Sequence, residues 1–261
     1  MRSLLSQALH ISQQAALDDS LIPIATEARP ITEQGHTFLL HVATDWQHRK
    51  RAAGQRPKGD NPFLPPEDNL VVSEINADHL CILNKFPVLQ PHLLLISRAF
   101  EAQETPLTLA NFAAAAKMMA QLDYQGLMFY NAGLIAGASQ RHRHLQWVPQ
   151  AQCLPDPADG PLPFTHYCLP LDDWQPDTLF ATYQHALQQA GWQAGYAYNL
   201  LLTQRQLWLI PRSQSDWQGI SINSLGFAGS FFVRDEQEAA QLVAQGFLNA
   251  LTAVSGWPTN T

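Results

Sequence analysis

The chain has 261 residues, of which 46% are hydrophobic and 14% are charged. This composition is typical of a folded globular protein and excludes disorder over most of the length. The formal net charge of -7 argues against a general binder of nucleic acids or anionic membranes, which would need many Lys and Arg side chains.

The compartment and the metal content are also constrained by the sequence. No stretch approaches the roughly 18 consecutive apolar residues of a membrane helix, and the N-terminus does not have the pattern of a signal peptide. The cysteines Cys81, Cys153 and Cys168 have no C-x-x-C spacing, which argues against a disulfide framework and against a cysteine zinc site. We therefore expect a cytoplasmic protein with no tightly bound cofactor and no metal site of its own.

The N-terminal part is predicted to form a helix followed by short strands. Residues 3–17 place apolar side chains near helical spacing, which predicts an amphipathic helix. The predicted strands are Phe38–Val42, Leu70–Val72, Leu80–Leu83 and His92–Ile96. Because the last three are short and closely spaced, they indicate an antiparallel sheet.

The middle of the chain adds a helix and two strands. Thr105 and Pro106 have the residue types of an N-cap and a first helical position, ahead of an apolar stripe that ends at Ala120. The predicted strands are Leu127–Tyr130 and His142–Val148, and a Gly- and Ala-rich loop, Asn131–Gln140, joins them. The next segment, Pro149–Pro163, contains five prolines and predicts a linker or a long crossover.

The C-terminal part again mixes helices and strands. We predict a helix near Thr178–Gln189, strands at Tyr196–Thr203 and Gln206–Pro211, and a final helix that a capping box from Asp235 to Glu238 opens. The whole chain, residues 1–261, is expected to form one domain. In it, residues 1–150 form the core that carries the chemistry, and residues 151–261 complete the fold.

A basic segment interrupts this pattern. Arg49, Lys50, Arg51, Arg56 and Lys58 lie close together among residues that are typical of loops. Two interpretations remain open. The segment is either a solvated loop or a mobile arm that approaches a polyanionic small molecule.

The most informative run is GASQRHRHLQ, which ends at Gln146. On a strand, side chains alternate between two faces, so His142, His144 and Gln146 share one face and the residues between them share the other. In the preceding loop, small residues let backbone N–H groups approach an anion, and Ser139 and Gln140 add side-chain donors. The sequence therefore predicts a phosphate cradle beside two imidazoles.

Three interpretations compete for His142 and His144. In the first, the two histidines are polar groups on a half-exposed strand. In the second, they are ligands of one zinc ion, although no third ligand is evident. Alternatively, a neutral imidazole attacks an activated phosphorus atom and splits one displacement into two. The neighbouring cradle favours the nucleophile.

The same run resembles the H-x-H-x-Q signature of the nucleotidyltransferase branch of the histidine triad superfamily. Further segments extend the resemblance to the ATP adenylyltransferases, also called diadenosine tetraphosphate (Ap4A) phosphorylases: Asn61–Pro66, Leu83–Ile96, Tyr198–Thr203, Ile210–Ser213 and Ile222–Arg234. The resemblance implies an α+β fold, in which helices flank a histidine-triad-like antiparallel sheet. It also implies that Ap4A reacts with phosphate to give ADP and ATP.

The resemblance further implies roles for single positions. His144 would be the nucleophile that attacks the α-phosphorus and forms a nucleotidyl-His144 intermediate, and Gln146 would donate to a non-bridging oxygen. The other implied substrate contacts are Lys50, Asn84, Lys85, Asn131, Gly137, Ala138, Ser139, Gln140, His142, Asn223, Ser224, Gly226 and Gly229. For the last two, a simple turn is the alternative.

Two departures from related proteins narrow the expected function. The chain lacks the paired cysteines of the metal site usual in galactose-1-phosphate uridylyltransferases, and Gln146 stands where mononucleotide hydrolases have a third histidine. The expected partners are a dinucleoside polyphosphate, ATP, ADP and inorganic phosphate, with Mg²⁺ accompanying the substrate phosphates; neither nucleic acid nor membrane is expected. The alternatives are a hexose-1-phosphate uridylyltransferase, a non-catalytic nucleotide-binding regulator and a zinc-binding module.

Overall fold

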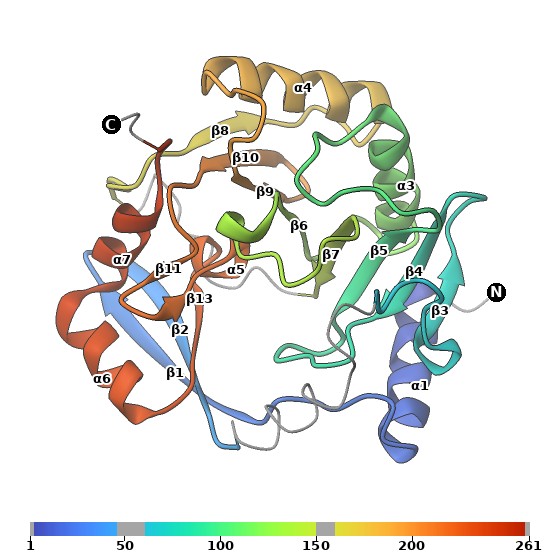
Figure 1. Ribbon diagram of the computed structural model, residues 1–261, viewed down its shortest axis with the longest axis horizontal. Coiled ribbons are helices and arrows are strands. Elements are labelled where there is room, and N and C mark those ends of the chain that lie inside the picture. Colours follow the sequence, from blue (N-terminus) through green and yellow to red (C-terminus); the bar gives the residue numbers. More distant parts are fainter. Residues whose placement is uncertain (1–2, 46–60, 150–159, 259–261) are drawn as a thin grey trace.

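The computed structural model describes residues 3–45, 61–149 and 160–258. Its centre is an eight-stranded sheet in which all neighbouring strands are antiparallel (Figure 1). In spatial order the strands are β3 (Val71–Glu74), β4 (His79–Leu83), β5 (Leu93–Ser97), β7 (His144–Val148), β6 (Leu127–Asn131), β9 (Tyr198–Leu202), β10 (Gln206–Pro211) and β8 (Tyr167–Pro170). The sheet thus joins the N-terminal and C-terminal parts of the chain, and the strand with the two-histidine motif lies near its middle.

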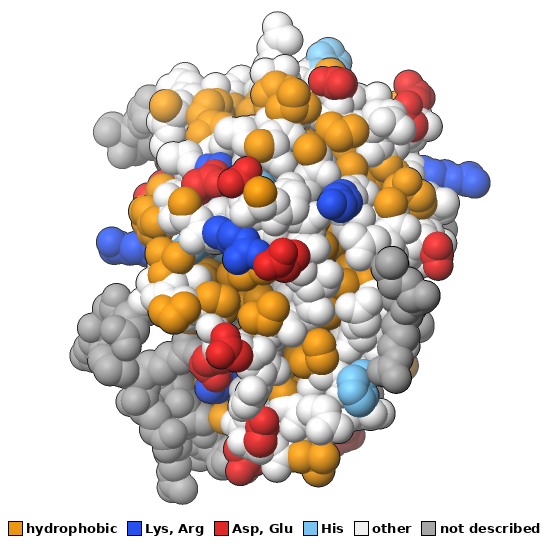
Figure 2. Space-filling view, turned by 90° about the vertical axis from the view of Figure 1, so that its right-hand side faces the viewer, with side chains coloured by type: hydrophobic (Ala, Val, Ile, Leu, Met, Phe, Trp, Pro, Cys, Tyr) orange, Lys and Arg blue, Asp and Glu red, His pale blue; other side chains and the backbone are white. Residues whose placement is uncertain are grey.

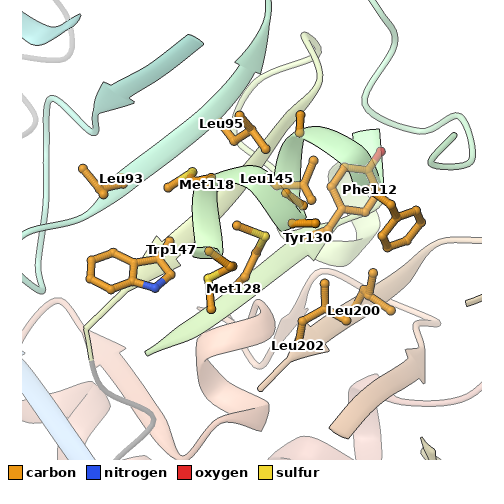
Figure 3. Packing of buried hydrophobic residues seen from close by; sticks show 14 of the residues in the cluster. Leu93, Leu95, Phe112, Met118, Met128, Tyr130, Leu145, Trp147, Leu200 and Leu202 are labelled. Atoms are coloured by element: carbon orange, nitrogen blue, oxygen red, sulfur yellow. The ribbon is translucent and has the colours of Figure 1, made fainter. Parts of the chain in front are cut away.

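One face of the central sheet packs on helices α1 (Leu4–Leu17), α3 (Leu109–Ala120) and α4 (Pro176–Gln189). Alternate side chains of the middle strands point into this layer, as Figure 3 shows beneath α3. They include Leu93, Leu95, Met128, Tyr130, Leu145, Trp147, Leu200 and Leu202. Because these residues alternate along their strands, the residues between them, among them His144 and Gln146, face the opposite side of the sheet.

The opposite side is partly covered by a smaller layer. It contains a three-stranded sheet of β1 (Thr26–Glu33), β2 (His36–Ala43) and β13 (Ser230–Val233), together with α5 (Ser224–Phe227), α6 (Glu236–Gln245) and α7 (Phe247–Val254). Strand β13 pairs in parallel with β2, which brings the C-terminal part beside the N-terminal hairpin. Two short 3-10 helices, η1 (Asp68–Leu70) and η2 (Leu134–Ala136), and a small hairpin of β11 (Asp216–Trp217) and β12 (Ile220–Ser221) complete the fold.

The antiparallel α+β architecture and most of the predicted elements are confirmed. The predicted start of α3 was wrong, because Thr108 and not Thr105 is the N-cap. The Thr108 hydroxyl accepts from the Asn111 N–H, and the Asn111 side-chain oxygen accepts from the Thr108 N–H. The start of β7 also differs. His142 precedes the strand and forms an isolated bridge with Ala102. The sequence analysis did not predict strands β1, β8, β11, β12 and β13 or helices α5 and α7.

Membrane-spanning helices and the charge of the surface are relevant to the expectation of neither membrane nor nucleic-acid partners. Within the described ranges, no helix is long and apolar enough to span a membrane. On the face that Figure 2 shows, Lys and Arg side chains are scattered among Asp and Glu side chains. The basic segment that contains Lys50, and most of the proline-rich segment, lie outside the described residues.

Candidate active site

His144 stands at the start of β7, buried and with a defined tautomer. Its Nδ1 lies 2.8 Å from the carbonyl oxygen of His142. Since a carbonyl only accepts hydrogen bonds, Nδ1 carries the proton and Nε2 keeps its lone pair. Burial lowers the pKa of His144 to about 4, so the ring is neutral at pH 7. No described residue hydrogen-bonds Nε2, and the ring borders a cavity.

His142 uses both ring nitrogens within the protein. Its Nε2 donates to the Ser97 carbonyl oxygen over 2.8 Å. Its Nδ1 accepts from the Asn61 amide over 2.9 Å, and the Asn61 oxygen is itself fixed by the Phe63 N–H. Both ring nitrogens of His142 are thus bonded within the protein, and its contact with substrate stays a prediction. His142 also orients His144 through its backbone carbonyl.

Gln146 is oriented by a short chain of hydrogen bonds. The Phe86 N–H donates to the Asn84 side-chain oxygen, so the Asn84 amide nitrogen faces His92 and donates to its Nδ1 over 3.2 Å. His92 Nε2 then donates to the Gln146 oxygen over 2.9 Å. Burial lowers the pKa of His92 to about 4, which keeps this ring neutral. The Gln146 NH₂ group is left to donate into the adjoining cavities.

Sequence reasoning treated His92 only as part of a strand. A signal was available, because it is a polar residue directly before the otherwise apolar run LLLI of the predicted strand. Its partner Gln146, however, lies 54 positions away in the sequence. The pairing of β5 with β7 brings the two together.

Two cavities meet beside these groups. The larger has a volume of about 410 Å³ and the smaller one of about 110 Å³. Asn84, Ser139 and Gln146 line both. The other expected site residues that line the larger cavity are Asn131, Gly137, Asn223 and Gly226, and those that line the smaller are Lys85, Gln140 and His144.

Asn131, which lines the larger cavity, has a side-chain donor without a partner among the described residues. Its side-chain oxygen accepts from the Asn199 amide over 2.8 Å and from the Ser224 hydroxyl over 2.7 Å. These bonds determine which end of the amide is nitrogen. That nitrogen is buried and has no hydrogen-bond partner among the described residues. A buried donor without an acceptor costs folding free energy, and an oxygen atom of a bound ligand can serve as that acceptor.

Three further expected contacts, Ser224, Ala138 and Gly229, do not line either cavity. Ser224 is fully buried and orients Asn131 through its hydroxyl. Ala138 is buried, and its N–H donates to the Gly133 carbonyl, which shapes the loop. Gly229 has φ +82° and leads into β13, as a turn residue would, and its contact with substrate stays a prediction.

The loop between β6 and β7 packs directly on the segment before α5. Gly137 has φ +89°, and a Cβ at this position would lie 2.6 Å from the Asn223 Cβ. A buried arginine, Arg212, holds the two segments together: Nη1 donates to the Ala136 carbonyl over 3.2 Å, and Nη2 to the Ile222 carbonyl over 2.8 Å. Burial lowers the pKa of Arg212 to about 9, which still leaves it charged at pH 7.

The smaller cavity contains one cation that was expected from the sequence. Lys85 Nζ lies 2.7 Å from a carboxylate oxygen of Glu67, and both residues line this cavity. The Lys85 side chain is about three-quarters buried. An incoming phosphate would therefore meet a positive charge that already has a carboxylate neighbour.

A neutral imidazole with an available lone pair, fixed amide donors and a glycine-shaped loop are the groups that transfer at phosphorus requires. This arrangement is typical of a nucleotidyltransferase. Comparisons with known proteins give the particular family. The Ap4A phosphorylase N-terminal domain family matches residues 1–165, and the ATP adenylyltransferase C-terminal domain family matches residues 160–256. The chain belongs to the Ap4A phosphorylase family.

Two curated relatives from Saccharomyces cerevisiae agree with this assignment. Protein APA1 is 28% identical over 259 residues, which cover 81% of each chain. Diadenosine 5',5'''-P1,P4-tetraphosphate phosphorylase 2 is 30% identical over 236 residues, which cover 71% of this chain and 72% of the relative.

Solved structures show the same fold. Yeast Ap4A phosphorylase Apa2 matches with a TM-score of 0.81 and 22% identity, covering 99% of both chains. Its complex with AMP matches with a TM-score of 0.81 and 25% identity, covering 99% of this chain and 98% of the other. The histidine-triad-like α+β fold expected from the sequence is confirmed.

Proposed function

We propose that this protein catalyses the reversible phosphorolysis of Ap4A to ADP and ATP by double displacement through a nucleotidyl-His144 intermediate. Membership of the Ap4A phosphorylase family and the named yeast relatives support the reaction. The observation that carries the mechanism is the hydrogen bond from His144 Nδ1 to the His142 carbonyl, because it leaves Nε2 as the nucleophile.

The reaction then has two in-line steps. In the first, His144 Nε2 bonds to the α-phosphorus of Ap4A, the bond from that phosphorus to the bridging oxygen breaks, and ATP leaves with the electron pair. The ring becomes cationic, and the bond from Nδ1–H to the His142 carbonyl stabilises that charge. In the second, an oxygen of inorganic phosphate attacks the same phosphorus, the N–P bond breaks, and ADP leaves.

The donors around His144 stabilise negative charge on the transferring phosphoryl group. The Gln146 NH₂ group and the Asn131 amide nitrogen are both aimed by hydrogen bonds made at their oxygen ends. The Ser139 hydroxyl lies where the two cavities meet. Donors that are fixed before the reaction need little reorganisation as the charge develops, which is the main source of such catalysis.

The acceptor is proposed to be phosphate and not water. An amide does not titrate near pH 7, so Gln146 gives water no general base. Inorganic phosphate brings an ionised oxygen of its own, and Lys85, Ser139 and Gln140 supply donors along the smaller cavity. This arrangement favours ADP and ATP as products, with AMP a minor one.

We also propose that Mg²⁺ accompanies the substrate phosphates. Across residues 3–45, 61–149 and 160–258, no three or more His, Cys, Asp or Glu side chains gather in a metal-binding group. Mg²⁺ commonly binds through substrate phosphates and water and needs few protein ligands. Activity that a zinc-selective chelator removes, and that zinc but not magnesium restores, would contradict this proposal.

Covalent capture tests the mechanism. Ap4A labelled at the α-phosphate should leave label on the protein in the absence of phosphate, and the label should be acid-labile and base-stable, as expected of a phosphoramidate. His144→Ala should lose both label and turnover. His185→Ala, which changes an exposed histidine on α4, should retain both. Normal turnover by His144→Ala would show that the mechanism is wrong.

A further inference from the structure

We propose that Gln103 is a positioning residue for the nucleophile His144. Its side-chain amide takes the place of a strand residue between His144 and Asn131. It thereby sets the distance from His144 to the loop between β6 and β7. This inference rests on the proposed function of His144. Nothing in the sequence around Gln103 indicated such a role, because the residue lies in an irregular segment between β5 and α3.

The pairing of β6 with β7 stops short of the site. Three residue pairs are in register, Leu127 with Val148, Met128 with Trp147, and Phe129 with Gln146. The same register would place Asn131 opposite His144, but these two residues are not paired. The strands therefore separate just where each carries a group that faces the cavities.

The Gln103 side chain fills this separation with peptide-like hydrogen bonds. Its Oε1 accepts from the His144 N–H over 2.8 Å, and its Nε2 donates to the His144 carbonyl over 3.2 Å. The same Nε2 donates to the Asn131 carbonyl over 2.8 Å. One amide thus satisfies both backbone groups of His144 and one of Asn131, as a neighbouring strand residue would.

The backbone of Gln103 is itself anchored. The residue is fully buried. Its N–H donates to the Arg141 carbonyl over 2.8 Å, and its carbonyl accepts from the Tyr130 hydroxyl. Arg141 precedes the two-histidine motif and Tyr130 belongs to β6, so both sides of the separation hold Gln103 in place.

Two consequences follow for the site. Without an inserted amide, neighbouring backbones approach to the usual spacing of about 4.8 Å, which would bring the His144 backbone toward Asn131. With the amide in place, Asn131 turns its side chain to Asn199 and Ser224, and the loop that starts there can leave the sheet. A nucleophile displaced by about 1 Å loses roughly 10²-fold in rate.

Isosteric variants test this positioning role in the first half-reaction, the single-turnover formation of nucleotidyl-enzyme from Ap4A without phosphate. Gln103→Glu keeps the shape, but at pH 8 its carboxylate has no donor for the two carbonyls. We expect about 10–100-fold slower formation of the intermediate, with the KM for Ap4A nearly unchanged. A protonated carboxyl again has one donor and one acceptor, so the rate relative to the parent protein should recover on lowering the pH to 5.5.

Two comparisons complete this test. Gln103→Met, which fills the space without hydrogen bonds, should be slow at both pH values. Gln188→Glu on the exposed side of α4 should behave as the parent does. Parent-like rates in folded Gln103→Glu and Gln103→Met, or equal losses in both variants at both pH values, would overturn the inference.

A measurement on the unmodified chain covers variants that fail to fold. A scalar coupling across the hydrogen bond, from the His144 amide nitrogen to the Gln103 side-chain carbonyl carbon, should be present in NMR spectra. Its absence, together with fast exchange of the His144 amide, would overturn the inference. Failure of the proposed function is recognised separately, because it would appear as a His144→Ala variant that still forms the intermediate.

Discussion

Three buried histidines beside the cavities, His92, His142 and His144, each have one defined tautomer. His142 and His144 each donate to a backbone carbonyl, and His92 accepts at Nδ1 from the Asn84 amide and therefore donates through Nε2. Burial lowers the pKa of all three, so none carries a charge at pH 7. The lone pair of His144 Nε2 is therefore available without prior loss of a proton.

The pH dependence of intermediate formation should reflect this neutral ring. An ordinary histidine, with a pKa near 6.5, would be about nine-tenths protonated at pH 5.5 and would lose about tenfold in rate. The pKa of His144, about 4, predicts a nearly constant rate between pH 7.5 and 5.5. Single-turnover labelling from Ap4A without phosphate is the suitable measurement, because it excludes the titration of phosphate. A tenfold decline over this range would contradict the assignment.

Ser139→Ala removes a donor from the junction of the two cavities. A fixed donor to a developing phosphoryl charge is typically worth roughly 10²–10³ in rate. We therefore expect kcat to fall by about that factor, with a smaller change in KM. Steady-state kinetics with Ap4A and phosphate measure both, and Ser73→Ala on β3 is the matched control. An unchanged kcat would mean that Ser139 only shapes the loop.

Gln146→His tests why phosphate is the acceptor. A histidine at this position can titrate near pH 7 and can serve water as a base, whereas the amide cannot. The products should shift from ADP toward AMP, as measured by chromatography of the nucleotides with and without phosphate. If the parent protein without phosphate released AMP and ATP as fast as it makes ADP and ATP with phosphate, this account of Gln146 would be wrong.

At the scale of elements, local patterns predicted some features and not others. The alternation in the two-histidine motif was sufficient to place His144 and Gln146 on one face, because the period of a strand is a local property. Strand β13 was missed because it has only four residues and forms by parallel pairing with β2, almost two hundred positions earlier.

The same limit applies to the groups that orient the site. Gln103 bonds His144 across 41 positions, and Arg212 bonds Ala136 across 76. Neither residue type identifies such a partner in advance. Most of the site residues predicted from motifs line one of the two cavities, whereas the residues that hold them could be identified only from the fold.

The loop that bears Ser139 offers a test at this scale. Gly137→Ala adds a Cβ at 2.6 Å from the Asn223 Cβ, so the loop must move away from its partner segment. Gly195 has the same φ of +89° but no atom within 4 Å of an added Cβ. Both alanine variants should lose about 1–2 kcal/mol of stability from backbone strain.

Only Gly137→Ala should also lose activity, by about tenfold or more in kcat, because only there is the cradle displaced. Thermal unfolding and steady-state kinetics of both variants separate the two effects. Equal kcat values in the two variants would show that contact with Asn223 does not position the loop.

At the scale of the whole molecule, the site lies where the two parts of the chain meet. The central sheet places β6 and β7 from the N-terminal part beside β9 and β10 from the C-terminal part. Arg212, on the C-terminal side, donates to the carbonyl of Ala136 in the loop between β6 and β7 and to that of Ile222 before α5. Its Nε donates to the carbonyl of Val254 at the end of α7. Folding of the two parts and assembly of the site are therefore coupled.

The buried histidines give the folded state a characteristic response to acid. His92 and His144 each have a native pKa of about 4, against about 6.5 in an unfolded chain. Between these pH values the unfolded chain binds protons that the native state does not. The contribution of the two histidines to stability is therefore fully present above pH 6.5 and is lost as the pH falls toward 4. Burial also lowers the pKa of His41, His79 and His142, with the same sign.

The free energy of unfolding should therefore decrease from pH 7.5 to pH 5.5. Each of His92 and His144 contributes a loss of about 1.4 kcal/mol over this range, and the other three histidines add losses of the same sign. Urea denaturation at the two pH values measures the difference, and the protein should take up roughly two or more protons on unfolding at pH 5.5. His10→Gln, at an exposed position of α1, should leave the decrease unchanged. A free energy of unfolding that is equal at both pH values would show that these rings bind protons in the native state as readily as in the unfolded chain, which would contradict the lowered pKa of His92 and His144.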